Sequence, residues 1–150
     1  MITYKKSILD ALALLASASA AAAGPITVYK TPWCGCCHAW AEAVEKAGYQ
    51  VTSVDLEDLT QVRKQAGVPA DMEGCHVAAV DGYFLEGHVP LEAIGRLLSE
   101  RPDVAGLAVP GMPQGSLGMG SGPVDNYEVY AVPREQSETP SVFYKVGGRG

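Results

Sequence analysis

The feature that most constrains this chain is a cysteine cluster between a strand-type segment and a helix-type segment. Three of the four cysteines fall within Cys34–Cys37. The β-branched and aromatic run before them, residues 26–29, predicts a strand, and the periodic apolar residues that follow predict a helix up to Lys46. Cysteines in the first turn of a helix lie in the positive field of the helix dipole, which favours the thiolate. Because a thiolate binds soft metals and attacks disulfides, the cluster indicates one of these two chemistries.

Residues 1–23 are expected to be a secretory signal peptide. Lys5 and Lys6 form a basic start, residues 8–15 an apolar stretch, and residues 17–23 a zone of small residues suited to cleavage. A membrane anchor is the alternative, but a span needs roughly 20 apolar residues and Asp10 interrupts this stretch. We therefore expect an exported, periplasmic protein without stable membrane insertion, with a single domain over residues 24–150.

The charge of the chain argues against one class of partner. Loss of two lysines and one aspartate with the leader takes the formal charge from −6 to −7, and the chain contains no basic run. Phosphate contacts need clustered lysine and arginine, so nucleic acid is not an expected partner. Four cysteines in an oxidising compartment would ordinarily pair as two disulfides, and this is the simplest structural alternative.

The order of the expected elements predicts an α/β fold with a thioredoxin-like core. Strands are expected at residues 24–31, 49–55, 76–80 and 83–89, and helices at about 36–46, 59–66 and 91–101. The resulting order, β-α-β-α-β-β-α, matches the thioredoxin core and covers about residues 26–101. A loop rich in glycine, proline and methionine follows at residues 110–123, and C-terminal strand additions are expected at 127–132 and 141–146.

This topology predicts that the soft side chains of the chain meet at one edge of the sheet. If the third strand runs antiparallel to the first, its first residues, Cys75 and His76, lie beside the cysteine turn. The fourth strand then returns His88 to the same edge. The loop after the last helix is long enough to bring Met112 and Met119 most of the way back. The candidate metal ligands are therefore Cys34, Cys36, Cys37, Cys75, His88, Met112 and Met119.

The donor types favour copper over zinc. Thiolates and thioethers together select Cu(I), whereas the C-x-C-C spacing is not the usual C-x₂₋₄-C of a zinc site. Adjacent Cys36 and Cys37 cannot easily both point at one tetrahedral ion, but each can bridge neighbouring Cu(I) ions. The sequence therefore predicts a site for more than one Cu(I).

A redox enzyme is the main alternative. Residues 33–37 differ from the thioredoxin active-site pentapeptide only in having Cys36 where proline is usual, and Cys34 and Cys37 form a C-x-x-C pair. Two features argue against it: Cys36 offers a competing partner, and Cys75 stands where oxidoreductases of this fold have a cis-proline. The pattern favours a metal-binding protein over an enzyme and is compatible with redox activity coupled to copper.

Four motifs together resemble the CopG-like family of bacterial copper-resistance proteins, which are exported, thioredoxin-like and metal-binding. They are T-P-W-C-G-C-C-H, G-C-H-V-A, G-H-V-P and P-G-M-P-x-G-S-x-G-M, and the likeness spans about residues 26–132. The resemblance implies copper bound by the four cysteines and, from its less specific motifs, by His88 and the loop methionines. We therefore expect a protein that holds Cu(I) for copper resistance, with copper ions and other exported copper-handling proteins as partners. A thiol-disulfide oxidoreductase and a disulfide-stapled domain with no metal role remain the alternatives.

Overall fold

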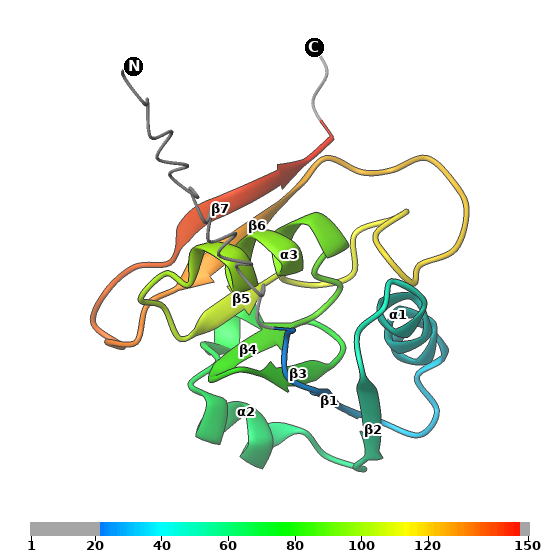
Figure 1. Cartoon of the computed structure of the whole chain (residues 1–150), viewed down its shortest axis with the longest axis horizontal. Coiled ribbons are helices and arrows are strands. Elements are labelled where there is room, and N and C mark those ends of the chain that lie inside the picture. Colours follow the sequence, from blue (N-terminus) through cyan, green and yellow to red (C-terminus); the bar gives the residue numbers. More distant parts are fainter. Residues whose placement is uncertain (1–21, 148–150) are drawn as a thin grey trace, which may run out of the picture.

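A computed structural model describes residues 22–147 of the chain. The expected signal peptide lies almost wholly outside these residues. Within them, seven strands form one mixed sheet in the order β2-β1-β3-β4-β5-β6-β7 (Figure 1). The strands are β1 (Ile26–Lys30), β2 (Val51–Asp55), β3 (Val77–Val80), β4 (Tyr83–Glu86), β5 (Gly106–Ala108), β6 (Tyr127–Val132) and β7 (Ser141–Val146). The helices are α1 (Gly35–Lys46), α2 (Thr60–Ala66), the short 3₁₀ helix η1 (Ala70–Met72) and α3 (Leu91–Glu100).

The helices cover both faces of the sheet because side chains alternate along each strand. On β4, Leu85 belongs to the larger core cluster, which also holds Trp40 of α1 and Ile94 of α3. The neighbouring Phe84 belongs to a second cluster, against which Val62 of α2 packs. Helices α1 and α3 therefore cover one face, and α2 covers the other.

The strand pairings confirm the predicted arrangement, in which the third strand runs antiparallel to the first and the fourth strand returns to the same edge. Strand β1 pairs in parallel with β2 and antiparallel with β3, and β3 pairs antiparallel with β4. The C-terminal end of β1, the start of β3 and the end of β4 therefore meet at one edge of the sheet. The strands are shorter than predicted, so Cys75, His76 and His88 lie just outside them.

Two features were not predicted from the sequence. Strand β5 pairs in parallel with β4 and antiparallel with β6, which joins the C-terminal strands to the same sheet. Its Gly106 packs directly against the carbonyl and ring of Phe84, where a Cβ would clash. Helix η1 lies between α2 and β3, where no helix was predicted. The two C-terminal strands are confirmed, and they pair antiparallel with each other.

Within the described residues, no helix is long and apolar enough to cross a membrane.

Candidate metal and thiol site

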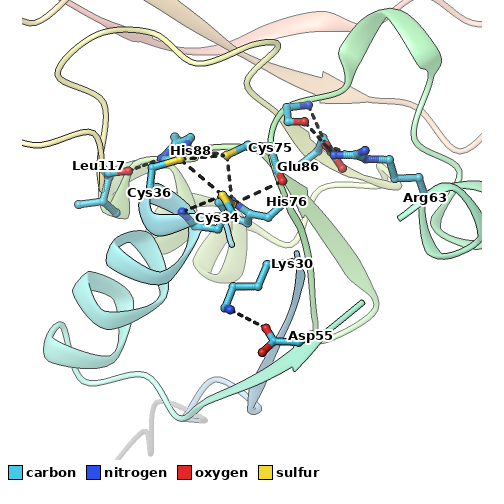
Figure 2. Close-up of a disulfide and its surroundings, with 12 residues drawn as sticks. Lys30, Cys34, Cys36, Asp55, Arg63, Cys75, His76, Glu86, His88 and Leu117 are labelled. Carbon is cyan, nitrogen blue, oxygen red and sulfur yellow. Dashed lines mark hydrogen bonds and ion pairs between the residues drawn. A yellow bond between two sulfur atoms is a disulfide. The ribbon is translucent and has the colours of Figure 1, made fainter. Parts of the chain in front are cut away.

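The cysteine turn carries the first half of the site. Cys34 is the N-cap of α1, and its Sγ accepts a hydrogen bond from the Cys37 backbone N–H at 3.3 Å. Cys34 and Cys37 are joined by a disulfide, whereas Cys36 and Cys75 are free (Figure 2). Cys37 is fully buried, and the other three cysteines are half-buried. The pairing matches the C-x-x-C spacing, and it leaves one disulfide where the stapled-domain alternative expected two.

Cys75 comes from the segment before β3 and faces the cysteine turn, as predicted. Its Sγ lies 3.9 Å from Cys36 Sγ, which in turn lies 3.6 Å from Cys34 Sγ. The four cysteine sulfurs all lie within 4.8 Å of one another, so they form a group that could hold metal. Burial, followed by the neighbouring Cys36, raises the pKa of Cys75 to about 12. Without a metal, Cys75 is therefore a neutral thiol at pH 7.

His88 stands beside Cys75, with its Nε2 2.7 Å from Cys75 Sγ. Its Nδ1 lies 2.5 Å from the carbonyl oxygen of Leu117. A carbonyl only accepts, so His88 carries its proton on Nδ1 and its Nε2 accepts the Cys75 S–H. Metal-binding histidines are commonly oriented in this way, with the second ring nitrogen donating to a backbone carbonyl. The lone pair of Nε2 is thus directed at the thiol side of the site.

His76 also belongs to this group, although it was not selected as a ligand from the sequence. It is fully buried, its Nδ1 lies 3.4 Å from Cys75 Sγ, and its ring packs on Trp40 at 4.5 Å between centroids. Its Nε2 has no hydrogen-bond partner among the described residues. Cys75, His76 and His88 form a second group of potential metal ligands, and Cys75 is common to both groups. The adjacency of His76 to Cys75 was the signal in the sequence that could have identified it.

The Gly/Pro/Met loop returns to the cysteine edge. Besides the contact of Leu117 with His88, Gly118 fits closely against the backbone of α1. A Cβ at Gly118 would lie 2.7 Å from Trp40 N and 2.8 Å from Cys36 O. Met119 follows directly and is half-buried, whereas the Met112 side chain is 56% exposed. The loop therefore reaches the site at residues 117–118, and the participation of the two thioethers stays a prediction.

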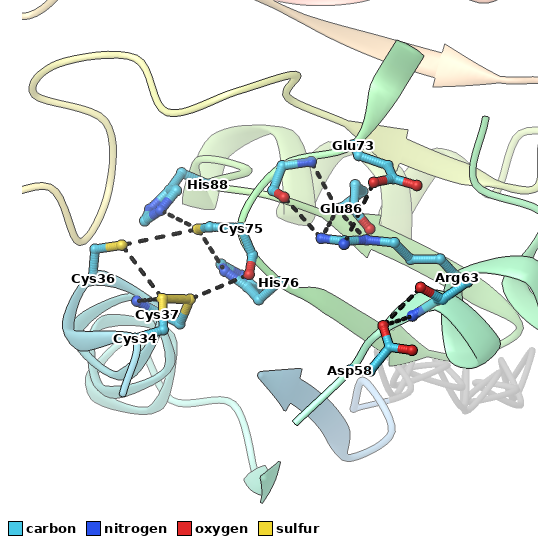
Figure 3. Close-up of polar contacts among 12 residues, drawn as sticks. Cys34, Cys36, Cys37, Asp58, Arg63, Glu73, Cys75, His76, Glu86 and His88 are labelled. Carbon is cyan, nitrogen blue, oxygen red and sulfur yellow. Dashed lines mark hydrogen bonds and ion pairs between the residues drawn. A yellow bond between two sulfur atoms is a disulfide. The ribbon is translucent and has the colours of Figure 1, made fainter. Parts of the chain in front are cut away.

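Two ion pairs lie near the site, each with one buried side chain, Lys30 in the first and Glu86 in the second, and neither was predicted. Lys30, at the end of β1, places its Nζ 2.5 Å from Asp55 Oδ1 (Figure 2). Arg63 of α2 pairs with the fully buried Glu86 at the end of β4 (Figure 3). Lys30 follows Ile26 and Val28 at the buried positions of β1, and Glu86 ends a strand that is buried throughout. A charged residue at such a position was the available signal in the sequence.

The fold and this edge define a mixed α/β protein with a thiol and imidazole cluster that could hold metal. The chain is similar to two solved structures, "Copper resistance protein copG- Form 1" and "Form 2". Form 1 is 41% identical, with a TM-score of 0.77, and the match covers 85% of this chain and 100% of that one. Form 2 is also 41% identical, with a TM-score of 0.76, and the match covers 83% and 100%.

Residues 72–119 match a family described as "Protein of unknown function, DUF411". The matched range contains Cys75, His76, His88 and both loop methionines. No curated protein matches the chain. The chain belongs to the CopG-like family, as the sequence motifs indicated, and a copper-related function is supported by these relatives and by the cysteine cluster.

Proposed function

We propose that this chain is an exported protein that holds Cu(I) in its cysteine cluster and serves copper resistance. The observation that carries the proposal is the convergence of four cysteine sulfurs within 4.8 Å, with His88 against Cys75, in a relative of copper resistance proteins. The thioredoxin-like character of the core is part of the proposal. It is supported by the order of β1 to α3 and by the position of the C-x-x-C pair at the start of α1.

The donor set fits a soft monovalent ion. In the reduced protein, Cys34, Cys36 and Cys37 supply thiolates from one turn, and Cys75 supplies a fourth from the opposite segment. Thiolates favour Cu(I), and a thiolate can bridge two ions, so we propose more than one Cu(I) per chain. His88 would add a neutral nitrogen, and Met112 and Met119 would act as weaker thioether donors at the loop.

The redox state of Cys34 and Cys37 would control how much Cu(I) the protein can bind. A disulfide sulfur has no thiolate to offer, so the oxidised protein retains only Cys36 and Cys75 as thiols. An external dithiol would convert the disulfide into two thiols by giving up two electrons and two protons and becoming a disulfide itself, and we propose that this reduced form is the one that takes up copper. A periplasmic thiol-disulfide oxidoreductase is the second candidate, and the Cys34–Cys37 disulfide itself favours it.

The binding should depend on pH in a defined direction. Because the pKa of Cys75 is raised to about 12, a metal that binds this sulfur must displace a proton. Copper affinity should therefore fall as pH falls, since protons compete for the thiolates.

Replacement of Cys75 tests the proposal most simply. We expect Cys75→Ser to weaken Cu(I) binding by more than the roughly 10–100-fold typical of outer-shell changes, because it removes the sulfur shared by both ligand groups. Cys34→Ser should behave similarly. The measurement is anaerobic competition for Cu(I) with a chelator of known affinity, with reduced protein.

His38→Gln is the matched control, because His38 follows the cysteines directly but its side chain is 64% exposed and faces Glu42. Equal Cu(I) affinity in the parent and in Cys75→Ser would contradict the proposal. Fast multiple-turnover reduction of a disulfide substrate by the parent would favour the oxidoreductase.

A further inference from the structure

The Arg63–Glu86 pair lies beside the cysteine cluster and contacts the segment that carries Cys75 (Figure 3). Arg63 Nε and Nη2 both donate to Glu86 Oε1, at 3.0 and 2.8 Å. The same oxygen accepts the backbone N–H of Gly74 at 2.8 Å, and Arg63 Nη2 donates to the Gly74 carbonyl at 2.8 Å. Both polar groups of the Gly74 backbone are thus bound by this pair, which we call the Arg63–Glu86 clamp.

The hydrogen bonds of the clamp differ from those of an isolated arginine–carboxylate pair, because they include the backbone of Gly74. An arginine and a carboxylate in isolation prefer two parallel hydrogen bonds, one to each oxygen. Here Glu86 Oε1 accepts three donors, whereas Oε2 is buried with no partner among the described residues. The arginine and the Gly74 N–H therefore share one carboxylate oxygen.

The clamp also joins the two segments that carry the ligands. Gly74 precedes Cys75, and Glu86 stands two residues before His88. A Cβ at Gly74 would lie 2.6 Å from the Cα of Gly87, so the two segments touch at their glycines. The Gly87 N–H donates to the His76 carbonyl at 2.8 Å at the same crossing. The relative position of Cys75 and His88 is set where these segments cross.

A buried ion pair is weak support for stability, because burying two charges costs several kcal/mol and apolar replacements are often neutral or stabilising. The contribution specific to this pair is its two hydrogen bonds to the backbone of Gly74. We propose that Arg63 and Glu86 are positioning residues. They hold Cys75 near Cys36 and His88, in the geometry needed to bind a soft metal ion. The inference rests on the proposed copper site for its purpose, but the geometry is testable without copper.

The test uses an arsenical as a probe of the distance between two thiols. Phenylarsine oxide condenses with two neighbouring thiols, forms two As–S bonds and releases water. In the protein with the Cys34–Cys37 disulfide, Cys36 and Cys75 are free, 3.9 Å apart, and should be bridged by one arsenical. Affinity is measured by competition with a small dithiol and read by intact mass, and Cys75→Ser should abolish the bridge.

Two variants disrupt the clamp in different ways. Arg63→Gln leaves Glu86 buried without its cation. This variant is expected to lose stability of the fold as well as the hydrogen bond to Gly74. The double variant Arg63→Met with Glu86→Leu removes both charges and should fold. We expect the double variant to lower arsenical affinity by about 10–100-fold, the range of outer-shell effects, and to lower Cu(I) affinity in the reduced state similarly. Arg134→Gln, which removes an exposed pair with Asp103, is the control and should change neither affinity.

The outcomes separate this inference from the proposed function. Parental arsenical affinity in a folded double variant would overturn the positioning role, and so would failure of the double variant to fold, since the pair would then support the whole fold. If the parent binds the arsenical but no Cu(I), and the clamp variants still weaken the arsenical, the proposed function fails and the positioning role stands.

Discussion

At the scale of single residues, burial keeps both histidines of the site neutral. Burial is the largest cause that lowers the pKa of His76, to about 3, and the nearby His88 adds to it. Burial also lowers the pKa of His88, against the hydrogen bond to Leu117 that raises it. A neutral imidazole is the form that binds metal, so this environment makes both rings available as ligands.

The same burial predicts how stability depends on pH. Between about pH 3 and pH 6.5 the unfolded chain binds a proton at His76 that the folded chain does not, and the lowered pKa of His88 acts in the same direction. The free energy of unfolding should therefore fall as pH falls below about 6.5, by at most about 1.4 kcal/mol per pH unit for each histidine. Urea unfolding of the metal-free protein at pH 7.5, 6 and 5 measures this slope.

His76→Leu should remove part of that slope, whereas His38→Gln removes an exposed imidazole and serves as its control. An unchanged slope in His76→Leu would contradict this, because it would mean that folding does not lower the pKa of His76. Neither the burial of His76 nor its unpartnered Nε2 could be predicted from the sequence, because both depend on tertiary packing, in which Trp40 of α1 is one neighbour.

At the scale of elements, the loop of residues 110–123 is held to α1 through Gly118. Both Gly118 and Gly120 have positive φ, at +90° and +85°, so alanine is strained at either. Only at Gly118 would the added Cβ also meet the backbone of α1, at Trp40 and Cys36; at Gly120 nothing lies within 4 Å. Gly118→Ala should therefore lower the unfolding free energy by about 1–3 kcal/mol more than Gly120→Ala does. Chemical denaturation of the two variants tests this, and equal losses would mean that the loop does not pack on α1 in solution.

The thioethers of this loop have a separate expected effect. Thioethers are neutral and weaker donors than thiolates, so their loss should not abolish binding. Met112→Ala with Met119→Ala should speed the transfer of copper to a competing chelator and leave the stoichiometry unchanged. Met72→Ala is the control, because Met72 packs against the core cluster on the α2 face. Release rates equal to those of the parent would indicate that the loop only links α3 to β6.

The elements differ in how far the sequence predicts them. The alternation and turn signals were strong enough to predict β1, β3, β4 and the two C-terminal strands, and with them the edge where the cysteines meet. Strand β5 was missed because its three residues are buried on both faces and show no alternation. The Arg63–Glu86 contact was missed because it joins a helix to a strand through tertiary packing, which no local pattern encodes.

At the scale of the whole molecule, the topology of the sheet explains why the cysteine and histidine side chains of the site lie at one edge. The C-terminal end of β1, the start of β3 and the end of β4 lie together, and the loop after β5 returns to them. Each ligand segment is short and is anchored by a neighbouring strand or helix. The site therefore depends on the complete fold and not on the C-x-C-C motif alone.

The central claim is that this edge binds a cluster of Cu(I) ions. The direct measurement is an anaerobic titration of the fully reduced protein with Cu(I), with metal content and free thiols counted on the protein afterwards, and with Zn(II) as competitor. The account predicts more than one Cu(I) per chain and a strong preference for Cu(I), because the donors are soft thiolates. A stoichiometry of one, or equal competition by Zn(II), would contradict it.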